Sequence, residues 1–287
     1  MQLLRISVIL LVFIDITCAE GLSGNPPGLG MSVKELFGRW LRSSGGEAAW
    51  KGIIDIEFDL IGTVRFSGVL IEERERHVRI KLQPRLRMKM EFTDPKKRRT
   101  IFARDGRGWF KYKEGIPKDQ GWWDRRNPQV YDDFETKDEV SFELKGIGFW
   151  LGMPFILQRP GVRIRFAGFL KPLVLGDKPL PMLEIDLTAL KDWPIDLLVV
   201  ALSQRDWQPV EARYRFRGED EMPNTCIFFD FVKTKGLYYP STRVFYDDTK
   251  PSGERVEKMV NVVANTWIHQ DEFKRPNEGE HWYKRRQ

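Results

Sequence analysis

Most of this sequence alternates apolar and polar residues with a period of two, and a single uncharged apolar stretch interrupts the alternation. Short alternating segments separated by turn residues run from residue 53 to 113 and again from 162 to 268. The interruption, at residues 146–157, reads GIGFWLGMPFIL. About a dozen strands are more than a twisted open sheet usually holds without curling. We therefore predict a mainly β fold, a large curved antiparallel sheet or incomplete β-barrel, whose concave face is covered by this insert.

The alternation also predicts where the strands lie. In the first half we expect strands at residues 54–60, 64–70, 77–82, 86–92, 100–104 and 108–113, with a turn at Gly62. In the second half we expect them at residues 162–170, 183–190, 197–202, 209–216, 225–233, 237–246 and 256–267. Because short turns join successive segments, an up-and-down meander with one face toward water is the simplest topology.

Two segments carry helical signals. Residues 32–35 form a capping box, and an apolar stripe at helical spacing follows it, which predicts an N-terminal helix beginning after Ser32. A second capping box, at residues 136–139, predicts the start of the insert helix. Gly146 and Gly148 weaken that helix and Pro154 breaks it, so we expect a short, interrupted element. We interpret it as a plug in the open end of the barrel, with a movable lid as the alternative.

The first nineteen residues have the pattern of a signal peptide. Arg5 precedes an apolar run at residues 6–14, and Ala19 closes a small-residue cleavage site. We do not expect lipidation of Cys18, because residues 15–17 are not the small or aliphatic residues that a lipoprotein signal needs. No later stretch is long and apolar enough to cross a membrane. These features predict an exported protein that is soluble or attached to a membrane surface.

The residues after the predicted signal peptide divide into three segments. Residues 20–31 are rich in glycine and proline and are expected to be a disordered lead-in, residues 32–276 to be one domain, and residues 277–287 to be a polar basic tail. Once Cys18 is removed with the signal, Cys226 is alone, so the domain depends on its core and not on a disulfide.

Charge excludes one class of partner. The formal net charge is +6, from abundant residues of both signs, which is typical of solvated strand faces, and nucleic acid is not expected as a partner of an exported protein. Contact with an anionic membrane surface remains open. The candidates for it are the basic tail and a run that an exposed hairpin tip would equally explain: Lys96, Lys97, Arg98 and Arg99.

No motif points to catalysis, to a metal or to a cofactor. His77, His269 and His281 have no ligand spacing with a cysteine or carboxylate partner, and neither a nucleophile elbow nor a phosphate-binding glycine loop is present. Cys226 lies within an apolar strand and is interpreted as a core residue. We expect a protein that is not an enzyme and carries no cofactor.

Aromatic and apolar side chains offer the walls of a ligand cavity. The insert supplies some of them, the strand at residues 108–113 another, and a polar loop at residues 114–134 holds two tryptophans. The alternative is that these residues only fill the core. The predicted ligand-binding set is Trp109, Trp122, Trp123, Phe149, Trp150, Leu151, Met153 and Phe155.

Scattered short motifs resemble one known family. They are residues 45–50 (GGEAAW), Asp105-Gly106 with Trp109, and residues 229–231 followed by Gly236 and Pro240, with Asn265, Phe273 and Pro276 near the end. Together they resemble outer-membrane lipoprotein-sorting-like proteins, the LolA and LolB relatives. The resemblance covers most of residues 32–276 and implies a half-barrel around helices, a cavity for acyl chains and a periplasmic location. No acyl-gating residue can be matched position by position.

Three functions follow as hypotheses. The first is a periplasmic carrier that binds a lipid or a lipoprotein in a half-barrel cavity, and it requires an apolar cavity beneath residues 146–157. The second is a non-enzymatic structural or interaction module of the cell envelope, with a filled core and a docking patch on its outer face. The third, an exported hydrolase, requires a polar cleft in which carboxylates or His77 converge.

Overall fold

The computed structural model describes residues 28, 30–82, 86–93, 99–104, 109–114, 134–172, 178–191, 193–222, 224–247 and 253–273. The predicted signal peptide, most of the lead-in and the basic tail lie outside these residues. None of the helices in the described ranges has both the length and the hydropathy needed to span a bilayer.

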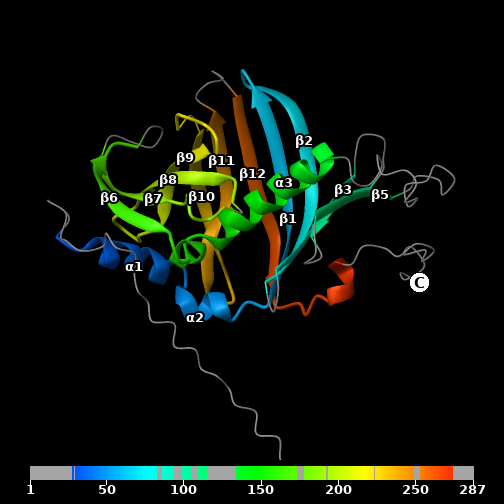
Figure 1. The fold of residues 1–287 in the computed structure, drawn as a ribbon, viewed down its shortest axis with the longest axis horizontal. Helices are drawn as coiled ribbons and strands as arrows, with labels where there is room; N and C mark the ends of the chain where they lie inside the picture. The colour runs from blue at the N-terminus through cyan, green and yellow to red at the C-terminus, as the bar shows by residue number, and fades with distance from the viewer. Residues whose placement is uncertain are drawn as a thin grey trace, which may run out of the picture.

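One antiparallel sheet of twelve strands forms the body of the molecule, in the order β5-β4-β3-β2-β1-β12-β11-β10-β9-β8-β7-β6 (Figure 1). The strands are β1 (Asp55–Phe66), β2 (Val69–Lys81), β3 (Arg87–Thr93), β4 (Arg99–Arg104), β5 (Trp109–Glu114), β6 (Arg163–Leu170), β7 (Leu180–Asp186), β8 (Ile195–Leu202), β9 (Pro209–Phe216), β10 (Asn224–Thr234), β11 (Leu237–Asp247) and β12 (Gly253–Ala264). The predicted meander is confirmed within each half. The two halves join where β1 pairs with β12, so the first and last strands lie at the centre.

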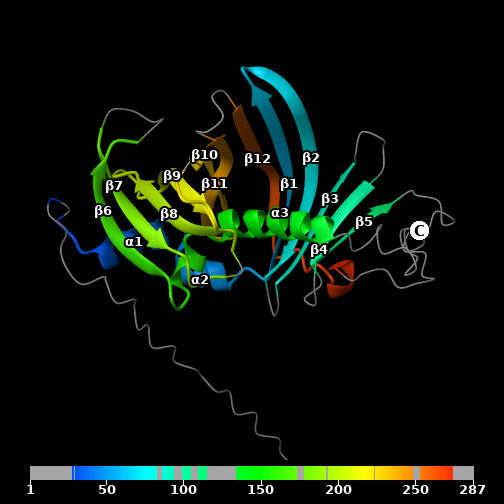
Figure 2. The same cartoon turned by 45° about the horizontal axis from the view of Figure 1, so that its top comes forward.

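The sheet is curved and stays open between its edge strands β5 and β6 (Figure 2). The chain must travel from one edge to the other between these two strands, and it does so across the concave face as helix α3 (Phe134–Gly152). A 3-10 turn, η3 (Phe155–Gln158), follows. The predicted fold class, an incomplete barrel whose concave face is covered by the insert, is confirmed.

The predicted turn at Gly62 is wrong, because β1 runs through this residue without a break and turns only after Phe66. A Cβ atom at Gly62 would lie 2.3 Å from Nη2 of Arg76, a side chain from the neighbouring strand. The glycine therefore makes room for a buried guanidinium on the concave face. β1 therefore includes the first predicted strand and the beginning of the second, whose last residues, 69–70, belong to β2.

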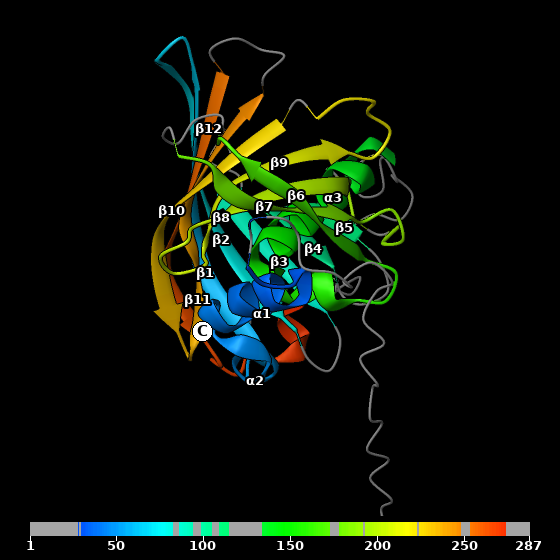
Figure 3. The same ribbon diagram turned by 90° about the vertical axis from the view of Figure 1, so that its left-hand side faces the viewer.

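Two short helices close one end of the concave face (Figure 3): α1 (Val33–Ser43) and α2 (Gly46–Lys51). The predicted start of α1 is confirmed, since Oγ of Ser32 accepts a hydrogen bond from the backbone N–H of Glu35 at 3.1 Å. The Glu35 carboxylate does not complete the capping box and instead accepts a hydrogen bond from Arg39. The apolar stripe of α1 is buried, as its spacing predicts.

The insert helix differs from its prediction in two respects. It begins at Phe134, two residues before the expected cap at Thr136, and it continues through Gly146 and Gly148 to Gly152. Gly148 has a packing role, because a Cβ there would lie 3.3 Å from the Cε atom of Met88. The prediction that Pro154 ends the helix is confirmed by the 3-10 turn that follows it.

Candidate functional site

The insert lies against two apolar clusters on the concave face, one in each half of the sheet. Phe149, Trp150 and Met153 pack with α1 and the strands β6 to β10, whereas Leu151 and Phe155 pack with β1, β2, β3 and β11. All five residues belong to the predicted ligand-binding set, and none is more than 8% exposed. The insert thus connects the two halves of the core.

Trp150 is at the centre of this contact. Its ring lies 5.3 Å from that of Tyr214, 5.8 Å from that of Phe228 and 5.7 Å from that of Phe245, as measured between ring centroids. On α3 itself, Phe149 packs edge-on against it at 5.2 Å. Such tilted aromatic pairs are favourable beyond the area they bury. α3 is therefore held on the sheet mainly by an aromatic cluster around one side chain.

Other members of the predicted sites are not tested by the described part of the chain. Trp109 begins β5, but its side chain is not described, and Trp122 and Trp123 lie outside the described residues. The predicted membrane contact of the basic run is likewise not tested. Lys96, Lys97 and Arg98 fall outside the described residues, and only the backbone of Arg99, at the start of β4, is described. Both assignments stay predictions.

One pocket of the described residues lies away from the insert. It has a volume of about 560 Å³ and lies on the outer face of the strands β6 to β9, where Glu184, Val199 and Arg213 alternate with core residues. Beneath the insert, the side chains pack against one another. Among the described residues, a ligand beneath α3 would have to displace these side chains.

Sequence reasoning missed a charged cluster between the two apolar clusters. One of its residues lies on α3 and four lie on β2, β11 and β12. We call these residues the charged cluster: Arg76, Glu143, Arg243, Arg255 and Glu257. Glu257 is 3% exposed, and its carboxylate pairs with Nη2 of Arg243 at 3.1 Å, with Nη2 of Arg76 at 3.7 Å and with Arg255. The one available signal was that Arg76 shares the apolar face of its strand with Val78 and Ile80.

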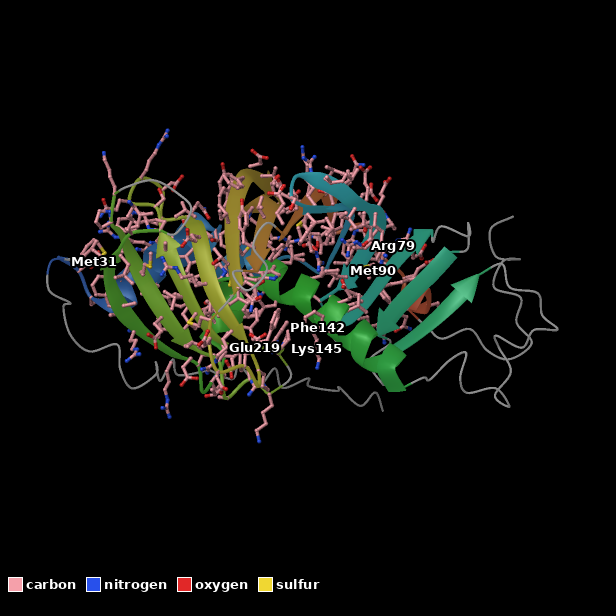
Figure 4. The ribbon with its side chains drawn as sticks, turned by 90° about the horizontal axis from the view of Figure 1, so that it is seen from above. Met31, Arg79, Met90, Phe142, Lys145 and Glu219 are labelled. Carbon is pink, nitrogen blue, oxygen red and sulfur yellow. The ribbon has the colours of Figure 1, made fainter. Side chains whose placement is uncertain are left out.

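α3 joins this cluster through Glu143. Its Oε2 atom lies 3.4 Å from Nη1 of Arg76 and 3.8 Å from Nη2 of Arg255. Beside it, Phe142 is 46% exposed and its ring lies 5.4 Å from that of Phe216 at the end of β9. In the view from above, Phe142 and Lys145 lie on the open side of α3 (Figure 4). Among the described side chains of α3, Glu143 contacts the sheet through charge, and those from Leu144 onward through apolar packing.

Burial and charge act in opposite directions on Glu257. Burial alone would raise the pKa of its carboxyl, but the guanidinium groups of Arg255, Arg243 and Arg76 outweigh burial and hold this pKa below its usual value. Glu257 is therefore ionised at neutral pH. Three arginines and two glutamates leave the charged cluster with one excess positive charge.

A second polar cluster lies on the outer face of the first strands. Nδ1 of His77 lies 2.7 Å from Oδ1 of Asp59, and Nε2 of His77 lies 3.5 Å from Oε1 of Glu57. His77 does converge with carboxylates, as a hydrolase would require, but on an open strand face and not in the pocket. In the described ranges no group of three residues has the geometry of a metal site. Cys226 is fully buried, and burial raises the pKa of its thiol well above the usual value, which makes it a core residue.

Comparison with known proteins shows which solved structures share this fold. No family model matches the sequence, and no curated protein matches it. Among solved structures, a LolA superfamily protein from Nitrosomonas europaea is similar over 85% of this chain and 98% of its own, with a TM-score of 0.55 and 10% identity. The chain has a LolA-like fold.

Two further structures share the LolA-like fold. An outer membrane lipoprotein-sorting protein domain from Vibrio parahaemolyticus has a TM-score of 0.53 at 10% identity and covers 84% of this chain and 97% of its own. A DUF1329 family protein from Desulfovibrio piger has a TM-score of 0.52 at 11% identity, with coverage of 84% and 97%. The resemblance noted from short motifs is confirmed at the level of fold.

Three of those motif residues, Gly45, Gly236 and Asn265, make contacts between separate segments of this LolA-like fold. A Cβ atom at Gly45, where φ is +108°, would lie 2.2 Å from the carbonyl oxygen of Gly236 in the β10–β11 turn. The side-chain amide of Asn265 accepts a hydrogen bond from Ile54 N at 2.8 Å and donates one to Gly52 O at 3.0 Å. These residues join the segments on either side of helix α2 to the β10–β11 turn and to the end of β12.

Proposed function

We propose that this protein is an exported, periplasmic carrier that binds the acyl part of a lipid or lipoprotein between α3 and the concave face of the sheet. The observation that carries the proposal is that α3 connects two apolar clusters of a LolA-like sheet through side chains alone in the described part of the chain. When α3 lifts, the two apolar clusters open to a ligand on either side of the charged pairs of Glu257 with Arg76 and Arg243. The protein performs no chemistry on its ligand and needs no cofactor.

The size of the ligand follows from what it must replace. α3 contributes five buried apolar side chains: Leu144, Ile147, Phe149, Trp150 and Leu151. Burying such side chains stabilises the fold by about 1.5–3 kcal/mol each, and burying a methylene by about 0.8 kcal/mol. A ligand that displaces all five must therefore bury on the order of ten to twenty methylenes. This range corresponds to one or two acyl chains and disfavours small apolar molecules.

A lipid carrier also needs a way to hold the empty state closed. The ion pairs of Glu143 with Arg76 and Arg255 attach α3 to the sheet beside the exposed Phe142. Arg76 and Arg255 both keep Glu257 as a partner when Glu143 leaves, so opening these two pairs leaves neither guanidinium without a counter-charge. In this proposal the insert acts as a movable lid, with the exposed Phe142 on the part that opens first.

A second function, an interaction module of the cell envelope, is favoured by one observation. The five insert residues of the predicted site are packed in the core, and this hypothesis requires a filled core. In that case α3 stays in place and binding occurs on the outer face or at a sheet end. The two functions differ in whether α3 moves.

The first experiment is mass spectrometry of the protein purified from a bacterial periplasm, under non-denaturing conditions and after organic extraction. We expect a stoichiometric acyl species that Trp150→Asp loses. The matched control is Trp267→Asp, since Trp267 is 74% exposed and far from α3 in sequence. If wild type and both variants are folded and equally free of lipid, the carrier hypothesis is wrong.

A reversible cross-link tests the movement of α3 without altering the core. The rings of Phe142 and Phe216 are in contact, so a Phe142→Cys/Phe216→Cys variant can be joined by a short bis-methanethiosulfonate that dithiothreitol releases. We expect the linked protein to take up no fatty acid from micelles and to recover uptake on reduction. Equal uptake in both states would show that α3 does not move, and lipid binding by a linked protein would place the ligand elsewhere.

A further inference from the structure

The β1–β2 hairpin ends in an apolar tip that the core does not use. Its turn is formed by Ser67 and Gly68, both with positive φ, as in the tightest hairpins. Four large apolar residues surround the turn at half exposure or more: Phe66 at 53%, Val69 at 62%, Leu70 at 50% and Ile71 at 65%. Figures 1 and 2 show this turn at the end of the sheet that rises beyond α3. We call residues 66–71 the apolar tip.

The apolar tip exposes apolar side chains on both faces of the hairpin. Phe66 pairs with Val69 across the turn, so these two side chains share one face. Leu70 pairs with Arg65, the next position along each strand, and therefore projects from the opposite face. A groove on a partner protein would cover one face of such a ribbon and leave the other in water. A lipid interface surrounds both.

One strand of the tip has its backbone paired on both sides, because Phe66 pairs with Val69 on one side and with Gly253 of β12 on the other. In the described residues β2 pairs with β3 only over residues 77–81, so the outer backbone edge of β2 at the tip needs water as its partner, which the headgroup region supplies and the acyl core does not. From the turn to residue 71 the hairpin extends about 10 Å, at roughly 3.3 Å per residue, which is the depth of the interface between headgroups and acyl chains. The Glu72–Arg74 ion pair follows directly and limits insertion to the tip.

The charges behind the tip indicate which lipids it contacts. Arg65 and Arg74 are accompanied by Glu72, Glu73 and Glu254, so the surroundings of the tip carry no excess positive charge. An anionic surface would not attract it. We propose that the apolar tip inserts into the interface of a phospholipid bilayer by apolar contact alone and so attaches the protein peripherally, independently of ligand binding under α3.

The test uses the full mature chain and phosphatidylcholine vesicles, with and without phosphatidylglycerol. Ile71→Cys, labelled with an environment-sensitive NBD group, reports insertion, and the native Cys226 is buried and does not react. We expect the emission to shift to the blue on neutral vesicles, with little effect of salt. Binding that requires phosphatidylglycerol and is lost at high salt would overturn the proposal and favour the basic run at residues 96–99.

A matched pair of variants separates the tip from the rest of the surface. Replacing residues 66, 69, 70 and 71 by threonine keeps strand propensity and removes apolar contact. We expect the vesicle partition coefficient to fall by more than about tenfold, with an unchanged melting temperature. Val263→Thr is the control, because Val263 is 51% exposed on β12 away from the tip. Equal loss in both variants, or a concentration-dependent dimer that only the tip variant abolishes, would refute membrane insertion.

Discussion

Replacing Glu257 by alanine tests the charged cluster directly. Glu257 is 3% exposed and faces Arg243 and Arg76, which are 1% and 6% exposed, so the variant leaves two buried guanidinium groups without their shared counter-charge. Removing one partner of a buried ion pair costs about 3–5 kcal/mol. Arg255 adds little to this figure, since its side chain is 39% exposed and can turn to water. The expected loss is at least about a fifth of the stability of a typical domain, which is about 5–15 kcal/mol.

Urea denaturation followed by circular dichroism measures this loss as a lower midpoint at an unchanged slope. Glu75→Ala is the control: Glu75 is an exposed carboxylate of the same β2 strand that holds Arg76, and it should change stability by less than about 0.5 kcal/mol. A third variant replaces Arg76 and Arg243 by methionine and Glu257 by leucine, and is expected to be nearly as stable as wild type. If Glu257→Ala costs less than about 1 kcal/mol, the cluster is not a buried ion network and the reasoning fails.

The pKa of Glu257 is lower in the folded state than the usual value of 4.5, so its ionised carboxylate stabilises the fold fully above that pH. This stabilisation of the fold is lost as the pH falls through the folded pKa. Acid titration should therefore destabilise wild type more than Glu257→Gln. Gly45→Ala should lower the free energy of unfolding by more than about 2 kcal/mol, because the new Cβ meets the Gly236 carbonyl. Gly146→Ala has open space around it and should raise the free energy of unfolding by about 0.5–1 kcal/mol. Thermal melts of the two variants compare these effects. Asp55 is fully buried and accepts three hydrogen bonds from residues 266 and 268, so Asp55→Asn should cost about 1–3 kcal/mol in urea denaturation, and an unchanged midpoint would contradict this.

Local patterns were sufficient wherever a segment's own residues decide its structure. The period of two predicted most of the strands, although it divided β1 at Gly62, and the spacing in α1 predicted its buried stripe, because both patterns follow from backbone geometry. The end of α3 was predictable in the same way, since Pro154 cannot continue a helix. The fold class followed from the number of strands and the single apolar insert.

Tertiary structure decided whatever depends on a partner distant in sequence. Gly62 has the local appearance of a turn, but its role is to leave space for Arg76 from another strand. The charged cluster is assembled from four separate elements, α3, β2, β11 and β12, so no short motif could reveal it. The sequence identified Trp150 as an apolar residue to be covered, and only packing placed three aromatic rings of the sheet around it. Burial is a property of the whole chain, and periodicity predicts its direction but not its partners.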